Sequence, residues 1–481
     1  MRKHKGKLIF LAVLVVFSYF NCLNNEFVSD DIFAIVNNPN LGDFGQVLAN
    51  PFYFLRPLQY FIVFSLFGKS AFYFRLISLV SHLLTVWGVY ALGGLLVSSW
   101  VGLTAAVLFA VHPLGVETVS WISAGGYVQM TAFAIWSLVF YLLAIGALNK
   151  GETFVKYYVW SVVSLLLALF SSERAVVIVG LMVLMSFCLG NLKKTWKYAI
   201  LPVGLSLVWL WMSLRGAGVR TESLQVNYYN DTGSVNFLMQ LPIAIGEYLK
   251  LFVWPVGLTL YHSDLAFNAW QFGLRVAVLL GFLGSVVWSF LKNKQVFFWL
   301  SWFLVCLSPT LLPFGLSWIV AERYVYMAMI GLCVVVAMGV EWILKQVQDD
   351  GGRDVVNFVL VLLVGALMFR TILRNNDWRT ADSLWFSAER YSTLSPQNHN
   401  NLGDAYGKRG MLELSRDHFL RAIELNPRYA DAMHNLGSAY LQMGEIEKAR
   451  ESFLRALENN PNLWQSKRAL ESIEEWEKQN P

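Results

Sequence analysis

The sequence predicts an all-α protein in two parts: a polytopic membrane bundle of about eleven transmembrane helices and a C-terminal α-solenoid. Hydrophobic residues make up 56% of the 481 residues and charged residues only 14%, whereas soluble domains carry about 25% charged residues. The composition also changes along the chain, because residues 1–373 hold long apolar runs and residues 374–481 are dense in Glu, Arg, Asn and Lys. We therefore expect a membrane domain over 1–373 and a water-exposed domain over 374–481.

The formal net charge of +5 belongs to loops, where basic residues set membrane topology, and it indicates no nucleic-acid partner. Four cysteines lie inside or beside apolar runs, at Cys22, Cys188, Cys306 and Cys333. None shows CxxC or histidine-paired spacing, so the sequence predicts neither a disulfide framework nor a zinc site.

The N-terminal apolar run, Leu8 to about Phe20, follows basic residues at positions 2, 3, 5 and 7. No small-x-small cleavage site follows it, and many more apolar runs do. We therefore expect an uncleaved first helix with its basic end in the cytoplasm. The first outer loop, 23–73, then lies on the extracytoplasmic face.

Further spans are expected wherever an apolar run approaches the ~20 residues that cross a bilayer. These runs are 75–97, 100–116, 127–148, 157–172, 175–190, 198–214, 273–291, 296–313, 323–344 and 355–373.

The stretch 241–262 is apolar but holds Glu247, Lys250 and two prolines. If it crossed the membrane, the basic residues of the later loops would face outward, against the positive-inside rule. We therefore expect an interfacial or re-entrant helix within a second outer loop, 215–272. The number of spans is then odd, so residues 374–481 emerge on the same side as the first outer loop.

The C-terminal part contains an internal repeat. The sequence Asn-Leu-Gly at 401–403 recurs at 435–437, 34 residues later. The same offset relates Ala405 to Ala439, Tyr406 to Tyr440, Phe419 to Phe453, Ala422 to Ala456 and Pro427 to Pro461. This period and pattern are the signature of tetratricopeptide repeats. The expected units are a partial repeat at 381–394, repeats at about 396–429 and 430–463, and a capping helix at 464–478.

Two adjacent carboxylates, Asp30 and Asp31, follow the first span in the sequence NEFVSDD. Membrane-flanking positions favour Lys, Arg, Trp and Tyr, so anchoring does not explain this pair. The alternative is a solvated loop end that happens to carry two acids. We take one of the two as a candidate working carboxylate.

Other ionisable groups also fall at the outer ends of spans. They are His112 and Glu117 after the third span, Glu173 and Arg174 between the fifth and sixth, and Glu322, Arg323 and Tyr324 at the tenth. A charge at the bilayer edge is a functional candidate, because its desolvation is costly unless it is used or paired. The alternative is that Glu173–Arg174 and Glu322–Arg323 are structural ion pairs or snorkelling anchors.

This set of residues suggests sugar transfer from a polyprenyl phosphate. An inverting transfer needs a carboxylate, Asp30 or Asp31, to take the proton of the acceptor hydroxyl. It also needs a cation to hold the leaving phosphate, for which Arg323 is the first choice and Arg174 the second. The sugar passes through an oxocarbenium-like state, which Glu117 could stabilise.

The same residues form an ordered set of motifs: FVSDD, RPLQY (56–60), FAVHPLGVETVSWIS (109–123), SSERAV (171–176), AERYVYM (321–327) and then the repeats. This set resembles the transmembrane-and-tetratricopeptide-repeat O-mannosyltransferases and, more distantly, the protein O-mannosyltransferases with their GT-C fold. The resemblance covers essentially the whole chain. It implies a GT-C membrane glycosyltransferase with an inverting mechanism, a polyprenyl-phosphate sugar donor and a protein hydroxyl as acceptor.

Matched by position, Asp30 and Asp31 correspond to the acidic motif of the first outer loop. Glu117 corresponds to the acid after the His112-Pro motif. The late ERY motif is matched by Glu322, Arg323 and Tyr324. The family usually has Lys-Glu where this chain has Ser172-Glu173, and Arg174 would supply the missing cation. The short repeat array favours a bacterial member of the family.

Several expectations depend on this resemblance. The sugar would be a hexose, with mannose as one candidate, and the acceptor a protein reached through the repeats. The alternatives are transfer to a lipid or a surface polysaccharide, and a non-catalytic scaffold that acts through its repeats. No cofactor is expected; a divalent metal at the acid pair is an alternative that the resemblance disfavours. The expected location is the bacterial inner membrane with the repeats outside the cytoplasm, or the endoplasmic reticulum membrane in a eukaryote.

Overall fold

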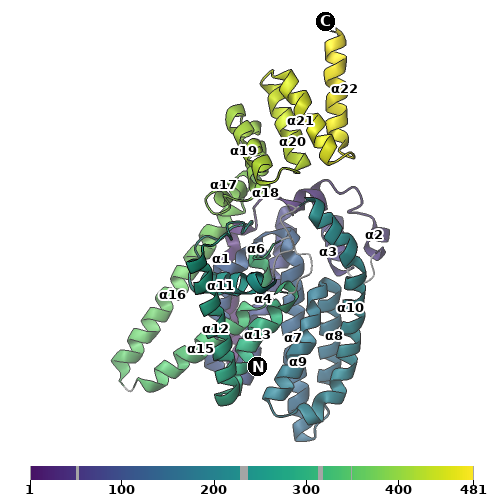
Figure 1. Ribbon diagram of the computed structural model, residues 1–481. Helices are drawn as coiled ribbons and strands as arrows, with labels where there is room; N and C mark the ends of the chain where they lie inside the picture. The colour runs from purple at the N-terminus through teal and green to yellow at the C-terminus, as the bar shows by residue number, and fades with distance from the viewer. Residues whose placement is uncertain (1, 50–53, 228–236, 312–317, 348, 480–481) are drawn as a thin grey trace.

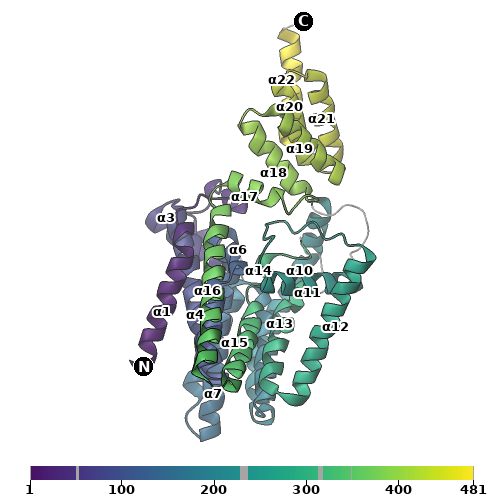
Figure 2. The same ribbon diagram turned by 90° about the vertical axis from the view of Figure 1, so that its left-hand side faces the viewer.

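The computed structural model describes residues 2–49, 54–227, 237–311, 318–347 and 349–479, and every regular element in these ranges is a helix. A bundle of long helices forms the larger part, and a column of shorter helices stands at one end of it (Figures 1 and 2).

The long helices of the bundle are α1 (Arg2–Tyr19), α3 (Leu55–Phe67), α4 (Ala71–Leu96), α5 (Ser99–Val111), α7 (Gly125–Lys150), α8 (Val155–Ser171), α9 (Val177–Cys188), α10 (Leu192–Asn227), α11 (Phe237–Val253), α12 (Ala269–Lys292), α13 (Lys294–Leu311), α15 (Met329–Gln346) and α16 (Asp350–Asp377). Short helical turns connect them: η1 (Phe20–Cys22), η2 (Ile32–Val36), α2 (Phe44–Leu48), η3 (Pro113–Gly115), α6 (Val116–Ser120), η4 (Ile122–Ala124), η5 (Glu173–Val176) and α14 (Glu322–Val325).

Among the described helices, seven are long and apolar enough to cross a bilayer. An eighth span results if α5 and the following segment Pro113–Ser120, bent by 60° from it, form one broken span. The other three predicted spans correspond to α8, α9 and α13, which do not reach the same length and apolarity; α9 has only 12 residues. The chain is a multi-pass membrane protein, and the total of eleven spans stays a prediction.

Helices α4 and α5 pack closely beside the turn that joins them, because glycine faces glycine between them. A Cβ atom at Gly102 would lie 2.6 Å from the carbonyl oxygen of Tyr90 and 2.5 Å from the backbone nitrogen of Gly94. Small residues of this kind let the backbones of membrane helices approach one another.

The predicted helix at 241–262 is shorter than expected at its C-terminal end. Helix α11 ends at Val253, and residues 254–268 are not helical. Pro255 explains the end, because proline lacks a backbone N–H and disfavours helical geometry in the residue before it. Helix α11 lies across the bundle rather than along it (Figure 2). Its Glu247 pairs with Lys250 at 3.0 Å and also with Arg275 of α12.

The C-terminal column consists of α17 (Ala381–Glu389), α18 (Pro396–Lys408), α19 (Leu412–Leu425), α20 (Ala430–Gln442), α21 (Ile446–Asn459) and α22 (Trp464–Gln479). The recurring glycines explain how two helices pack in each unit. A Cβ atom at Gly403 would lie 2.6 Å from the ring of Phe419, and one at Gly437 would lie 2.7 Å from the ring of Phe453. Each glycine therefore leaves the space that the next aromatic side chain fills.

The first outer loop and the start of the repeats lie at the same end of the bundle. The side-chain amide of Asn25 donates to the carbonyl oxygen of Asn375 at 3.0 Å, and the backbone N–H of Glu26 donates to that of Arg379 at 2.8 Å. Both bonds join the exit of α1 to the exit of α16. The acid pair and the repeats therefore share one end of the molecule.

This arrangement predicts a labelling pattern for single cysteines introduced at exposed positions. Gln46→Cys in α2 and Glu458→Cys in α21 should react with a membrane-impermeant maleimide from the same side of the membrane. Lys193→Cys, at the opposite end of the bundle, should react only after permeabilisation, because charged reagents do not cross the bilayer. The chain without an added cysteine controls for the native thiols. Labelling of positions 46 and 458 from opposite sides would contradict the arrangement.

Candidate active site

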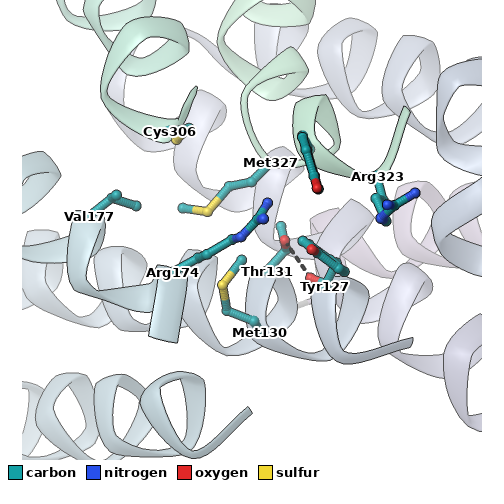
Figure 3. A pocket seen from close by; sticks show the side chains of 9 residues that line it. Tyr127, Met130, Thr131, Arg174, Val177, Cys306, Arg323 and Met327 are labelled. Atoms are coloured by element: carbon teal, nitrogen blue, oxygen red, sulfur yellow. Dashed lines mark hydrogen bonds between the residues drawn. The ribbon is translucent and has the colours of Figure 1, made fainter. Parts of the chain in front are cut away.

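The sequence-predicted residues gather at the end of the bundle that carries the repeats. They come from the first outer loop, the turn after α5, the turn η5 and the short helix α14. Figure 3 shows Arg174 and Arg323 on the wall of one pocket, although they lie far apart in the sequence.

Asp31 is fully buried and is held on both carboxylate oxygens. One oxygen accepts from the backbone N–H of Ser123 at 2.7 Å and from its hydroxyl at 2.6 Å. The other accepts from the backbone N–H of Val28 at 3.4 Å. Burial raises the pKa of Asp31, while the bonds from Ser123 and the nearby charge of Arg75 oppose that rise. With its oxygens occupied, Asp31 anchors the first outer loop to the segment before α7.

Asp30 is placed differently from its neighbour. Its residue is exposed, and Ser29 before it adopts a left-handed backbone with φ of 54°. This turn is uncommon outside glycine, Asn and Asp, and it precedes two carboxylates with different surroundings. The surrounding protein removes part of the hydration of Asp30 and raises its pKa, while the positive charge of Arg323 lowers it. Asp30 is thus the solvent-accessible acid of the pair, and it lies within electrostatic range of Arg323.

Arg323 forms a buried ion pair with Glu117. Its Nη1 lies 2.5 Å from Oε1 of Glu117, whose side chain is fully buried. The Arg323 side chain itself is 11% exposed, and its guanidinium carbon lies 5.0 Å from the ring centre of Tyr324 and 5.5 Å from that of Trp121. Glu117 therefore neutralises and holds the arginine, while the aromatic rings fix the plane of its guanidinium group.

Arg174 is the second cation of the site. Its guanidinium carbon lies 4.2 Å from the ring centre of Tyr324 and 4.8 Å from that of Tyr127. The arginine is delivered by η5, where the hydroxyl of Ser172 accepts from the backbone N–H of Arg174. Glu173 lies in the same turn and is half-buried. Tyr324 thus contacts both arginines and sets their separation.

The two arginines line a small hollow that is partly open to solvent. Its wall consists of Tyr127, Met130, Thr131, Arg174, Val177, Cys306, Arg323, Tyr324 and Met327. In Figure 3, Arg174 points into the hollow, and Arg323 lies on the opposite side of the hollow. Two cations beside methionine and valine suit an anion that is attached to an apolar chain.

Glu322 does not pair with its sequence neighbour Arg323, so the interpretation of these two as one structural ion pair is wrong. Its Oε1 accepts from Nη2 of Arg374 at 3.1 Å, and both side chains are fully buried. Arg374 also contacts Asp377 at 2.9 Å. The Nε2 atom of His262 lies 3.6 Å from the same carboxylate oxygen. Glu322 therefore faces the end of α16 rather than the hollow.

His112 has a structural role in this arrangement. Its Nδ1 accepts from the backbone N–H of Leu114 at 3.3 Å, and its Nε2 donates to the carbonyl oxygen of Phe252 at 3.0 Å. The ring also stacks on that of Phe252, with centres 5.0 Å apart. Both ring nitrogens are therefore occupied, and His112 joins the turn that carries Glu117 to the end of α11.

Sequence reasoning missed several residues of this site. Arg75 in α4 and Arg374 in α16 are fully buried, and a buried arginine within a span is itself a signal of a paired or functional charge. Ser123 and His262 carried no comparable signal. Within the described ranges, no three His, Cys, Asp or Glu side chains gather so that they could hold a metal ion.

Two family comparisons match parts of the chain. Residues 57–212 match the family described as dolichyl-phosphate-mannose-protein mannosyltransferase. Residues 394–462 match the tetratricopeptide repeat. These matches confirm the resemblance expected from the motifs, and a bacterial origin stays a prediction.

The chain is also similar to individual proteins over most of its length. It is 24% identical to protein O-mannosyl-transferase F38B6.6 of Caenorhabditis elegans over 465 residues, which cover 89% of this chain and 64% of that protein. It is 24% identical to protein O-mannosyl-transferase TMTC1 of Homo sapiens, with 89% of this chain and 56% of that protein covered. The chain thus spans less than two thirds of these relatives.

A solved structure with a similar arrangement is that of ArnT from Cupriavidus metallidurans bound to undecaprenyl phosphate. The two chains are 15% identical, with a TM-score of 0.40 over 93% of this chain and 77% of the other.

The different surroundings of the two acids predict different effects on stability. Asp31→Ala should lower the free energy of unfolding by about 1–3 kcal/mol, because it leaves the partly buried donors of Ser123 without an acceptor. Asp30→Ala should change it by no more than about 0.5 kcal/mol, because the residue is exposed. Thermal unfolding of the two purified variants in the same detergent checks the difference. Equal losses would contradict the anchoring role of Asp31.

Proposed function

We propose that the chain is a membrane glycosyltransferase that moves a sugar from a polyprenyl-phosphate donor to a protein hydroxyl with inversion. Mannose is the first sugar to test, because the relatives that cover 89% of the chain are named protein O-mannosyl-transferases. The observation that carries the proposal is a solvent-accessible carboxylate, Asp30, within electrostatic range of Arg323, which lines one hollow with Arg174. An acid and two cations at one end of a membrane bundle match the needs of transfer from a lipid phosphate.

In the proposed reaction, Asp30 acts as the general base. It takes the proton of the acceptor hydroxyl as the hydroxyl oxygen attacks the anomeric carbon of the sugar. The bond from that carbon to the phosphate oxygen breaks in the same displacement, and the electron pair leaves with the polyprenyl phosphate. Asp31 contributes by fixing the loop that presents Asp30, through its bonds to Ser123.

Arg323 and Arg174 hold the donor phosphate in this proposal. Guanidinium groups bind phosphate oxygens through two parallel N–H bonds and offset the charge that develops on the leaving group. Tyr324 keeps the two guanidinium groups apart by contacting both. Because Glu117 is paired with Arg323, we assign it to orienting that arginine rather than to contact with the sugar.

The repeats support a protein as the acceptor, since they stand at the same end of the bundle as Asp30. Transfer to a lipid or a polysaccharide is the alternative for the same site. Comparing the secreted glycopeptides and the envelope lipids of a deletion strain separates the two. Loss of glycopeptides supports the protein acceptor, whereas an unchanged glycoproteome with altered lipid supports the alternative.

The proposed base predicts the effect of a nearly isosteric change. Asp30→Asn should lower the rate of sugar transfer by about 10²–10⁴-fold at normal expression, because the amide cannot accept the proton. Asp354→Asn, an exposed acid near the start of α16 and far from the repeats, is the matched control and should keep wild-type activity. The measurement is transfer by the purified protein from a panel of polyprenyl-phosphate sugars. A scaffold without catalysis would show no difference between the two variants.

The surroundings of Asp30 also predict the pH dependence of transfer. Burial raises its pKa above the ordinary value of 3.8, so kcat/KM should fall at a higher pH than a free aspartate would give, as protonation removes the base. Arg323 lowers that pKa, so Arg323→Gln should move the acid limb of the profile to higher pH. Arg323→Lys keeps the charge and should leave the limb in place. A shift to lower pH in Arg323→Gln would show that another group controls the limb.

A further inference from the structure

Two buried polar groups face each other beside the proposed site without completing a hydrogen bond. The Nε2 atom of His262 lies 3.6 Å from Oε1 of Glu322, and the two side chains are 8% and 0% exposed. Among the described residues, neither His262 Nε2 nor Glu322 Oε2 has a hydrogen-bond partner. Buried polar atoms are almost always hydrogen-bonded, so this contact needs an explanation.

His262 lies on a segment, 254–268, that is fixed to the repeats by several bonds. The carboxylate of Asp264 accepts from the backbone N–H of Leu394 at 2.9 Å. It also accepts from the hydroxyl of Thr393 at 2.8 Å and from its backbone N–H at 3.2 Å. Because carboxylates bind backbone N–H groups strongly, Asp264 holds this segment against the turn before α18.

A second set of contacts fixes the same segment three to five residues before Asp264. The hydroxyl of Thr259 bonds to that of Ser392 at 2.7 Å, and Ser392 donates to the carbonyl oxygen of Tyr261 at 2.7 Å. The ring of Tyr261 stacks on that of Trp385 in α17. Successive side chains of an extended chain point to opposite sides. Tyr261 therefore contacts the repeats, while His262 points to Glu322 in the bundle.

The other partner of Glu322 is also attached to the repeats. Arg374 lies in the last turn of α16, the helix that leads directly to α17. Glu322 is thus flanked by two side chains, His262 and Arg374, whose segments are both joined to the repeat domain. It is also the residue before Arg323 in the one-turn helix α14. A change in the position of the repeats would reach the phosphate-binding arginine through this carboxylate.

We propose that His262 is a positioning residue for sugar transfer, which orients Glu322 and through α14 the guanidinium of Arg323. Segment 254–268 makes this orientation depend on the repeats, the part of the chain that would hold the acceptor. Contacts of this kind are often long in the free enzyme and tighten in the substrate complex. The inference rests on the proposed function, because Arg323 matters only if it holds the donor phosphate.

The test compares His262→Leu, which removes the N–H, with His262→Gln, which keeps one. Both are made in the full-length chain and assayed with a polyprenyl-phosphate mannose donor and an acceptor protein. His262→Leu should lower kcat about tenfold with less than about a twofold change in KM for the donor. His262→Gln should recover kcat to within about threefold of wild type. His4→Leu, at an exposed position in α1 at the end of the bundle away from the repeats, is the matched control and should keep wild-type kcat.

The hydrogen bonds of Asp264 allow a second test that leaves His262 unchanged. Asp264→Ala should lower kcat in the same direction as His262→Leu, and the double variant should be no slower than His262→Leu, because both changes act through one contact. If the fold-losses in kcat of the two single variants multiply in the double variant, Asp264 and His262 act through separate contacts. Equal kcat losses in His262→Leu and His262→Gln with a lower Tm in both would indicate a structural role and overturn the proposal, as would wild-type kcat in His262→Leu.

Hydrogen exchange provides a readout that does not depend on activity. Backbone amides of residues 321–326 should exchange faster in His262→Leu and Asp264→Ala than in wild type, and they should exchange at the wild-type rate in His4→Leu. Wild-type protein that is inactive with every donor, but shows this exchange pattern, would contradict the proposed function and leave the His262 contact in place. Active wild-type protein with unchanged exchange in the variants would contradict the positioning role alone.

Discussion

The buried ion pair between Glu117 and Arg323 is the interaction on which this end of the molecule depends. The two residues are 206 positions apart in the sequence, and their side chains meet at 2.5 Å with almost no exposure. A carboxylate with that little solvent needs a cation, because an unpaired charge at such a place costs several kcal/mol. The pair therefore holds the turn after α5 against α14, and the hollow forms beside that contact.

The adjacent acids show how one short loop can serve two purposes. Asp31 gives its oxygens to Ser123 and Val28 and is unavailable to a substrate. Asp30, one residue earlier, stays accessible and lies within electrostatic range of Arg323. An anchored neighbour gives the free carboxylate a defined position, which proton transfer requires. The different surroundings of Asp30 and Asp31 follow from the turn at Ser29, which has a left-handed backbone.

The sequence predicted those features that depend on composition and periodicity. The helical bundle, the repeats and the gathering of Asp30, Glu117 and Arg323 at one end follow from apolar run lengths, the 34-residue period and the parity of the spans. The partner of Glu322 could not be predicted, because the sequence offers its neighbour Arg323 for pairing, whereas helix geometry directs the two side chains apart. The contacts of His262 could not be predicted either, because a loop without periodicity gives no indication of which residues it contacts.

The central claim is that Asp30, Arg323 and Arg174 surround one donor site. It is tested most directly by an experimental structure of the protein with a polyprenyl-phosphate sugar bound. The account predicts the phosphate within hydrogen-bond distance of both guanidinium groups, with the anomeric carbon between the phosphate and the carboxylate of Asp30. A phosphate bound elsewhere, or one from which Asp30 is separated by protein, would contradict the account.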